Sequence, residues 1–244
     1  MRPMTFRPTL WPTVFTIPAI VVMICLAVWQ VQRLQWKEAM IAERVSRTTA
    51  AAVALPPAGG DLAAAEFRRI SGSGTFQHDR EFYLAARSQN GNVGYWILTP
   101  FRLDGGDTIL VNRGWVPENM KAPASRPEGQ VAGTVALDGI IRLPQQKTWF
   151  QPENEPEKNV WFYIDPAQMA AAGGVAMRTD LYVDAGTPQD AGANPGGFPI
   201  GGQTRINLPN DHLQYAITWA LLALALAAVY VIYHLKPVSE RKSS

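Results

Sequence analysis

The chain has few of the residues that build disulfide frameworks or zinc modules, with one cysteine and three histidines among 244 residues. Charged residues are also scarce, at 17% against about 25% in an ordinary soluble domain. The 22 Lys and Arg residues nearly balance the 20 Asp and Glu residues. This composition excludes a charged disordered tail and a basic nucleic-acid binder, so no nucleic-acid partner is expected.

Two long runs contain no charged residue at all. One lies between Arg7 and Arg33, and the other lies between His212 and His234. Each is as long as the roughly 20 residues that a membrane-spanning helix needs. We therefore predict transmembrane helices over residues 10–31 and 209–233, one near each end of the chain.

The first run has a rival interpretation as a cleaved signal peptide. No site of small residues follows Cys25, and the residue before this cysteine is Ile24, where a lipoprotein signal would have a small residue. Trp11 and Trp29 stand near the two ends of the run, as expected at membrane–water interfaces. These features favour an uncleaved anchor.

Basic residues at both ends of the chain predict its orientation. Short basic segments stay in the cytoplasm, whereas a long loop is exported regardless of its charge. We expect cytoplasmic tails over residues 1–9 and 234–244, too short for a folded cytoplasmic domain, and an exported segment between the spans. The basic residues in question are Arg2, Arg7, Lys236, Arg241 and Lys242.

The segment between the spans changes character near residue 66. Residues 32–65 are predicted to be a helical extension and a Pro/Gly-containing linker. Residues 66–208 form short β-rich segments separated by turn signals, with one helix expected over residues 165–172. The fold class is therefore membrane α+β, with a mainly antiparallel β domain shaped as a small barrel or sandwich. The seven expected strand segments are residues 67–76, 81–88, 93–103, 107–117, 131–144, 160–165 and 179–186.

Signatures of enzymatic catalysis are missing from this domain. The sequence has no G-x-S-x-G motif, and Cys25 lies in the first span. His78 stands beside Asp79 in a predicted turn, where we expect it to be solvated. Arg113 shares the apolar face of a strand with Trp115, and we expect it to stack on this ring rather than to clamp a ligand. We predict no catalytic residues and no enzyme.

The start of the second span carries the strongest candidate site. His212, Tyr215 and Trp219 are spaced i, i+3, i+7 and share one helix face. Asn210 or Asp211 is expected to cap the helix. The positive end of the helix dipole disfavours an imidazolium, and a neutral imidazole is what iron or copper ligation requires. A haem along this face would place its iron near His212. The alternative, that these residues are interface anchors, stays open.

The first span offers a matching strip at the same membrane level. Trp29, Arg33 and Trp36 recur at i, i+4, i+7, and Gln30 and Lys37 flank them. Aromatic faces and a cation are suited to receive a ring and its carboxylates. The alternative is an aromatic belt with a snorkelling arginine.

Five segments occur in an order that resembles a known family. They are WQVQRLQWK (29–37), EFRRISGSGTF (66–76), VGYWILTPF (93–101), ILVNRGWVP (109–117) and NDHLQYAITW (210–219). The chain thereby resembles the Surfeit locus protein 1 family of cytochrome c oxidase assembly factors. It departs from the family pattern at Ala27, Asp211 and Ala220, and none of these departures removes His212.

The resemblance implies an accessory inner-membrane protein that helps to insert haem a into the large subunit of a haem–copper oxidase. His212 would be the metal ligand, bound to the haem iron. Partners would be the large oxidase subunit and membrane lipid, with haem a synthase as a further candidate. The absence of an Arg/Ser-rich presequence favours a bacterial protein with a periplasmic domain.

Two other functions stay open. The chain could be a scaffold that stabilises oxidase assembly intermediates without binding haem. It could also be a membrane-tethered periplasmic enzyme, although no catalytic site supports this.

Overall fold

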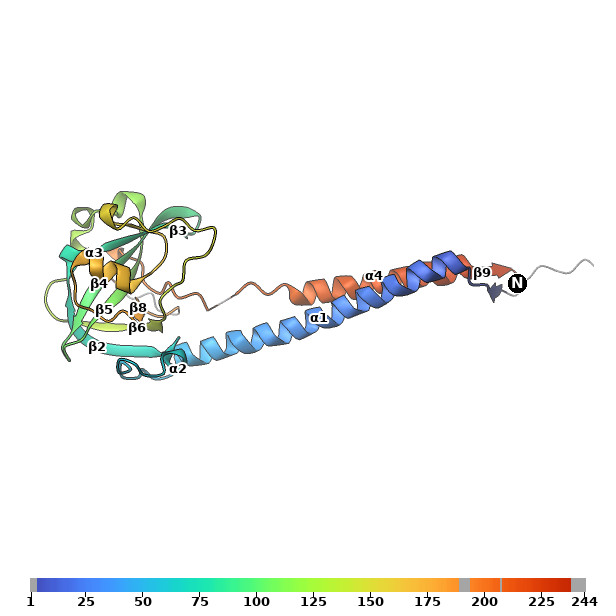
Figure 1. The fold of residues 1–244 in the computed structure, drawn as a ribbon, viewed down its shortest axis with the longest axis horizontal. Helices are drawn as coiled ribbons and strands as arrows, with labels where there is room; N and C mark the ends of the chain where they lie inside the picture. Colours follow the sequence, from blue (N-terminus) through green and yellow to red (C-terminus); the bar gives the residue numbers. More distant parts are fainter. Residues whose placement is uncertain (1–3, 189–193, 207, 238–244) are drawn as a thin grey trace, which may run out of the picture. The chain divides into compact units, whose positions relative to one another are not determined.

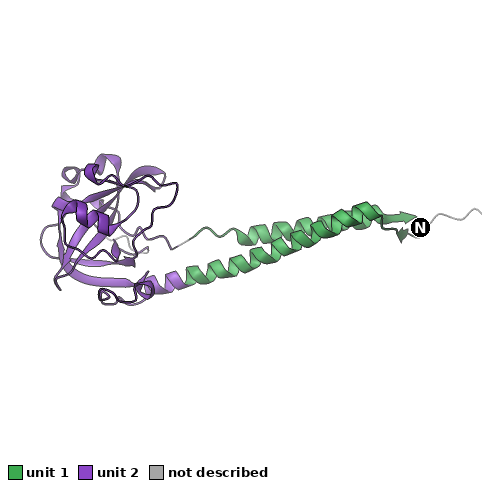
Figure 2. Ribbon diagram, viewed as in Figure 1, with its two compact units in different colours: residues 1–42, 207–244 green, residues 43–206 purple. Residues whose placement is uncertain are grey.

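The computed structural model describes residues 4–188, 194–206 and 208–237, and within them the chain divides into two compact units (Figure 2). Unit 1 joins the two ends of the chain, Met1–Ala42 and Asn207–Ser244, whereas unit 2 is Glu43–Ile206. The basic residues Arg2, Arg241 and Lys242 lie outside the described residues.

Unit 1 is built on two long apolar helices. Helix α1 runs over Leu10–Thr49 and helix α4 over His212–His234. Their most apolar stretches have mean hydropathies of 2.4 and 2.2, and almost none of this apolar surface is buried within the protein. Apolar helices that remain exposed along their length need a lipid environment. Among the described residues, two helices are long and apolar enough to cross a membrane, one near each end of the chain, as predicted.

The two helices of unit 1 run antiparallel and side by side (Figure 1). Near the beginning of α1 the Thr13 hydroxyl lies 2.7 Å from the Tyr230 hydroxyl, close to the end of α4. Strand β1 (Met4–Phe6) then pairs antiparallel with β9 (Leu235–Pro237). Both ends of the described chain therefore lie at the same end of the helix pair.

Unit 2 is a mainly antiparallel β domain. Its sheet order is β2-β6-β8-β5-β4-β3-β7, and β2 also pairs with β4, so five strands close into a small barrel while β3 and β7 extend from β4. Only the β3–β7 and β5–β8 pairs are parallel. Each of the seven strands falls within or overlaps a segment expected from the sequence. They are β2 (Arg69–Phe76), β3 (Phe82–Gln89), β4 (Asn92–Leu103), β5 (Thr108–Pro117), β6 (Val135–Arg142), β7 (Val160–Trp161) and β8 (Tyr182–Ala185).

Strand β5 is the centre of this domain because both of its faces are buried. Ile109 and Val111 belong to one apolar cluster with Phe101 and Val183, whereas Leu110 belongs to another on the opposite face. A strand that is covered on both sides leaves no solvent-facing positions. Any polar side chain on β5 consequently needs a partner inside the protein.

Short helices complete unit 2. Helix α3 (Pro166–Gly173) begins where the sequence predicts it, because the Asp165 carboxylate accepts from the amides of Ala167 and Gln168. Helix α2 (Leu62–Ala65) is capped similarly by Asp61. The single-turn helices are η1 (His78–Arg80), η2 (Glu118–Met120), η3 (Pro123–Ser125), η4 (Pro127–Gly129), η5 (Pro156–Lys158) and η6 (Pro195–Gly197).

Candidate functional site

His212 is the first residue of α4, as the sequence predicts, but the helix begins without a side-chain cap. Asp211 occupies the N-cap position with φ −93° and ψ 9°. This backbone conformation is not the extended one from which a capping carboxylate reaches the first free amides. The Asn210 Oδ1 atom is buried and makes no hydrogen bond. The expectation that Asn210 or Asp211 would cap the helix with its side chain is wrong.

The imidazole of His212 has a partner on the other membrane helix. Its Nδ1 atom lies 2.6 Å from Oε1 of Gln30, a side chain that is almost fully buried in α1. When the imidazole carries its proton on Nδ1, the ring donates to this carbonyl oxygen, which can only accept. The lone pair is then on Nε2. The contact therefore orients the ring and is compatible with the tautomer that is protonated on Nδ1.

Other residues hold the two helices together at this end. The Lys37 ammonium of α1 donates to the carbonyl of Pro209, just before α4. The Trp29 ring lies edge-on to the His212 ring, with centroids 6.5 Å apart and an interplanar angle of 86°. Gln30, Trp29 and Lys37 therefore bring α1 to the start of α4. Of these three residues, the sequence places Trp29 in the predicted site, and it gives Gln30 and Lys37 only as flanking residues.

The remaining predicted site residues do not contact His212 among the interactions of the described residues. The Arg33 guanidinium lies 3.9 Å from the centre of the Trp36 ring on its own helix. Tyr215 is 55% exposed, and Trp219 is half-buried. None of these contacts shows a shared binding site, so their part in ligand binding stays a prediction.

The residues around His212 fit a haem group in their donor chemistry. A histidine that ligates a metal almost always donates its other ring N–H to a carbonyl or carboxylate, as His212 can to Gln30. The described residues contain no group of three or more His, Cys, Asp or Glu side chains that could hold a bare ion. A site of this kind would offer a haem iron one protein nitrogen, that of His212.

The other histidine of unit 1, His234, is unsuited to ligation. Its side chain is fully buried at the end of α4. Its Nε2 atom lies 2.9 Å from the Thr9 hydroxyl, and its Nδ1 atom lies 2.8 Å from the Tyr230 carbonyl oxygen. Both ring nitrogens are thus occupied, and the ring fastens the start of α1 to the end of α4.

Unit 2 contains a buried charge cluster around Glu81. The Arg126 guanidinium approaches the carboxylate with both terminal nitrogens, one of them 3.1 Å from Oε1. Arg113 Nη1 and Gln130 Nε2 lie 3.3 and 3.4 Å from the same oxygen. The His78 Nδ1 atom is 3.8 Å away. We call these five residues the Glu81 cluster.

Burial and charge act against each other in this cluster. Burial alone would raise the pKa of Glu81, but the neighbouring His78 and Arg126 side chains and the charges of Arg126 and Arg113 lower it below its ordinary value. Burial lowers the pKa of Arg113 to about 10, although the Glu81 charge acts in the opposite direction. At neutral pH all three charges are present, and the cluster is a structural ion network.

Two expectations about this region are wrong. Arg113 does not stack on Trp115: it pairs with Glu81 and lies 4.8 Å from the centre of the Phe76 ring. His78 is not solvated either, because its Nε2 atom lies 2.9 Å from the Val131 carbonyl and its ring packs against Phe76. The physical reason is that both faces of β5 are buried. Arg113 therefore lies inside the protein, where residues of the neighbouring loops pack against it.

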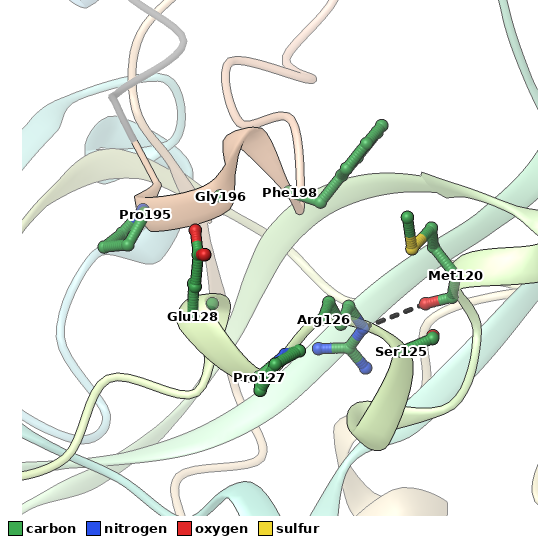
Figure 3. A pocket seen from close by; sticks show the side chains of 9 residues that line it. Met120, Ser125, Arg126, Pro127, Glu128, Pro195, Gly196 and Phe198 are labelled. Carbon is green, nitrogen blue, oxygen red and sulfur yellow. Dashed lines mark hydrogen bonds between the residues drawn. The ribbon is translucent and has the colours of Figure 1, made fainter.

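Two cavities border the cluster, and the one that Arg126 lines is too small for a large ligand. Its volume is about 170 Å³, below the roughly 300 Å³ at which ligand pockets usually begin. Figure 3 shows Arg126 at its wall, with Nε donating to the Met120 carbonyl at 3.0 Å. Because Arg126 is already paired with Glu81, it has no free charge for a ligand. The site around His212 is the better candidate.

Comparison with known proteins agrees with the resemblance seen in the sequence. The model of the SURF1 family matches residues 17–224. A SURF1-like protein from Monosiga brevicollis is 40% identical over 223 residues, which cover 86% of this chain and 83% of that protein. Surfeit locus protein 1 of Rattus norvegicus is 40% identical over 221 residues, covering 84% and 70%. The Homo sapiens protein of the same name is 39% identical over 221 residues, covering 84% and 71%.

Proposed function

The chain belongs to the SURF1 family, and from this premise we propose that it is an assembly factor for a haem–copper cytochrome c oxidase. In this role it assists the delivery or insertion of haem a into the large oxidase subunit. The observation that carries the proposal is the His212–Gln30 contact, which orients the imidazole and, in the tautomer protonated on Nδ1, leaves the Nε2 lone pair for a ligand. We assign the chain no catalytic residues.

The proposal gives each residue of the site a task. His212 would hold the haem iron through Nε2, and Gln30 would keep the ring in the required tautomer and orientation. Trp29, Tyr215 and Trp219 would contact the flat faces or edges of the macrocycle. Arg33 would leave Trp36 and pair with a propionate. When bound, haem a supplies an iron that accepts an axial nitrogen, and a single protein ligand suits a carrier that must release its cargo.

Purification from cells that make haem a tests this function. We expect the full chain to carry a Soret band, and cells without the chain to contain an oxidase with less haem a. A chain that purifies with oxidase subunits but never shows a Soret band would contradict haem delivery. That result would favour the scaffold function.

We further propose that the protein lies in a bacterial inner membrane with both termini in the cytoplasm and unit 2 in the periplasm. The β1–β9 pair supports a common side for the two ends of the described chain. The basic residues near these ends favour the cytoplasmic side.

Reporter fusions test this orientation. Alkaline phosphatase fused after Thr49, the last residue of α1, should be active because this position is exported. The same reporter after Ser244 should be inactive. The opposite pattern at either position would overturn the proposed topology.

A further inference from the structure

Two aromatic side chains of unit 2 are almost entirely in solvent. Trp149 is 93% exposed and Phe150 is 69% exposed. They lie in the loop between β6 and η5, and their rings contact each other edge-to-face with centroids 5.7 Å apart. Neighbouring exposed aromatic side chains of this size usually mark an interaction surface.

The loop holds these rings in a defined turn. The Gln151 amide donates to the Thr148 carbonyl at 3.1 Å, and the Thr148 amide donates to the Gln151 side-chain oxygen at 3.0 Å. An ion pair between Lys147 and Glu153 closes the base of the turn. The turn thus presents Trp149 and Phe150 together, rather than leaving each on a separate flexible segment.

Most other large apolar side chains with comparable exposure lie on the membrane helices α1 and α4. Among the other large apolar side chains of unit 2 that the structure describes, only Val93 is comparably exposed, at 67%. A second exposed Trp–Phe pair lies at the beginning of α1, where Trp11 and Phe15 are each 69% exposed and stack at 6.2 Å. That pair stands at the membrane boundary of the first span, where tryptophan is preferred.

We propose that Trp149 and Phe150 insert into the interface of the lipid bilayer that α1 and α4 cross. Unit 2 is joined to a membrane helix at each of its two ends, which keeps the loop at a high effective concentration near lipid. Two aromatic rings of modest interfacial affinity therefore attach it more readily than they would attach a free domain. The attachment restricts how the domain can turn on its two connections.

The net charge of the loop indicates whether the loop binds lipid headgroups by charge or inserts through its apolar rings. Residues 143–158 contain three acidic and two basic residues, so anionic headgroups do not attract this segment. Insertion depends on the apolar rings instead. It should be insensitive to added salt and to the fraction of anionic lipid.

Fluorescence of the full chain in lipid nanodiscs tests the proposal without haem or oxidase. Cys25 is replaced by serine, and an environment-sensitive NBD label is attached through Thr148→Cys, which keeps both aromatic side chains. We expect blue-shifted NBD emission, quenching by brominated lipid and protection from aqueous iodide. The double variant Trp149→Ser/Phe150→Ser should lose all three effects.

The matched control is the same label at Val93→Cys, an equally exposed apolar position of unit 2. Its NBD emission should be water-like both with the natural aromatic pair and in the Trp149→Ser/Phe150→Ser variant. Water-like emission at position 148 with intact aromatics would overturn the proposal. Emission that shifts only when purified oxidase is added would likewise overturn it, and would show that the pair docks on protein. Because the readout involves no haem, a failure here leaves the proposed assembly function untouched.

Discussion

Glu81→Gln is expected to lower the free energy of unfolding of unit 2 by about 3–5 kcal/mol, the usual result of removing one partner from a buried ion pair. The Glu81, Arg113 and Arg126 side chains are only 1–2% exposed. Glutamine has the same size but no charge, and its amide would turn N–H donors toward guanidinium donors. Two buried arginines would then lack their only carboxylate partner in the Glu81 cluster.

Denaturant unfolding of the full chain in mild detergent, followed by near-ultraviolet circular dichroism, measures this effect. Glu128→Gln is the matched control, because Glu128 is exposed in the neighbouring η4 and should change stability by less than about 0.5 kcal/mol. A loss below about 1 kcal/mol in Glu81→Gln would contradict the structural role of the cluster, since a buried carboxylate between two guanidinium groups cannot be that dispensable.

The pH dependence of stability follows from the lowered pKa of Glu81. A carboxyl group with a pKa lower in the folded than in the unfolded state stabilises the fold above its unfolded pKa. This contribution decreases as the pH falls below the ordinary value of 4.5 and through the folded pKa. The stability difference between the natural chain and Glu81→Gln should therefore shrink in acid. An unchanged difference across this range would contradict the assignment.

The sequence predicts the elements of unit 2 better than the contacts between them. Short segments rich in β-branched and aromatic residues, separated by turns such as Asn90-Gly91, are enough to place seven strands. The same pattern places Arg113 on a buried strand and shows that it needs a partner. It cannot name Glu81, because the two residues are 32 positions apart and their contact depends on how η1 folds over β5.

The family-like segment ILVNRGWVP illustrates the same limit. Gly114 lies within it at φ +126°, and a Cβ atom there would come within 1.9 Å of the Ile200 carbonyl oxygen. The returning chain bonds to β5 here, since the Trp115 amide donates to the same oxygen at 2.9 Å. The glycine is therefore required by a close backbone approach, which the sequence alone does not reveal.

At the candidate site, the sequence locates His212 but not its partner. The start of α4 follows from the end of the polar segment and the beginning of the apolar run. Gln30 is a polar residue at the boundary of an otherwise apolar helix, and such residues usually pair within the protein. This is the signal that could have found it. Which residue it meets depends on the register of α1 against α4, and neither helix encodes that register separately.

His212→Ala is expected to abolish the Soret band of the full chain purified from cells that make haem a, and to lower the haem a content of the oxidase. Alanine removes the free Nε2 lone pair, and no other histidine can replace it in the described structure: His234 has both ring nitrogens hydrogen-bonded, and His78 lies in unit 2. The variant should insert into membranes at normal levels, because a half-buried residue at the end of a helix contributes little to the membrane insertion of that helix.

Gln30→Leu separates ligation from orientation. It keeps the imidazole but removes the acceptor for Nδ1, and loss of such a partner typically weakens metal affinity about 10–100-fold. Titration of haem a into the purified chain should thus give a Soret band that saturates only at higher haem concentration. Arg33→Ala should weaken binding without removing the band, if its cation holds a propionate. Gln214→Ala, an exposed neighbour on α4, is the matched control and should bind like the natural chain.

Replacement of His78 or His234 should leave haem binding per folded molecule unchanged, because both rings are packed and hydrogen-bonded within the protein. If His212→Ala binds haem like the natural chain, His212 is an interfacial residue. The role in oxidase assembly would then rest on protein contacts.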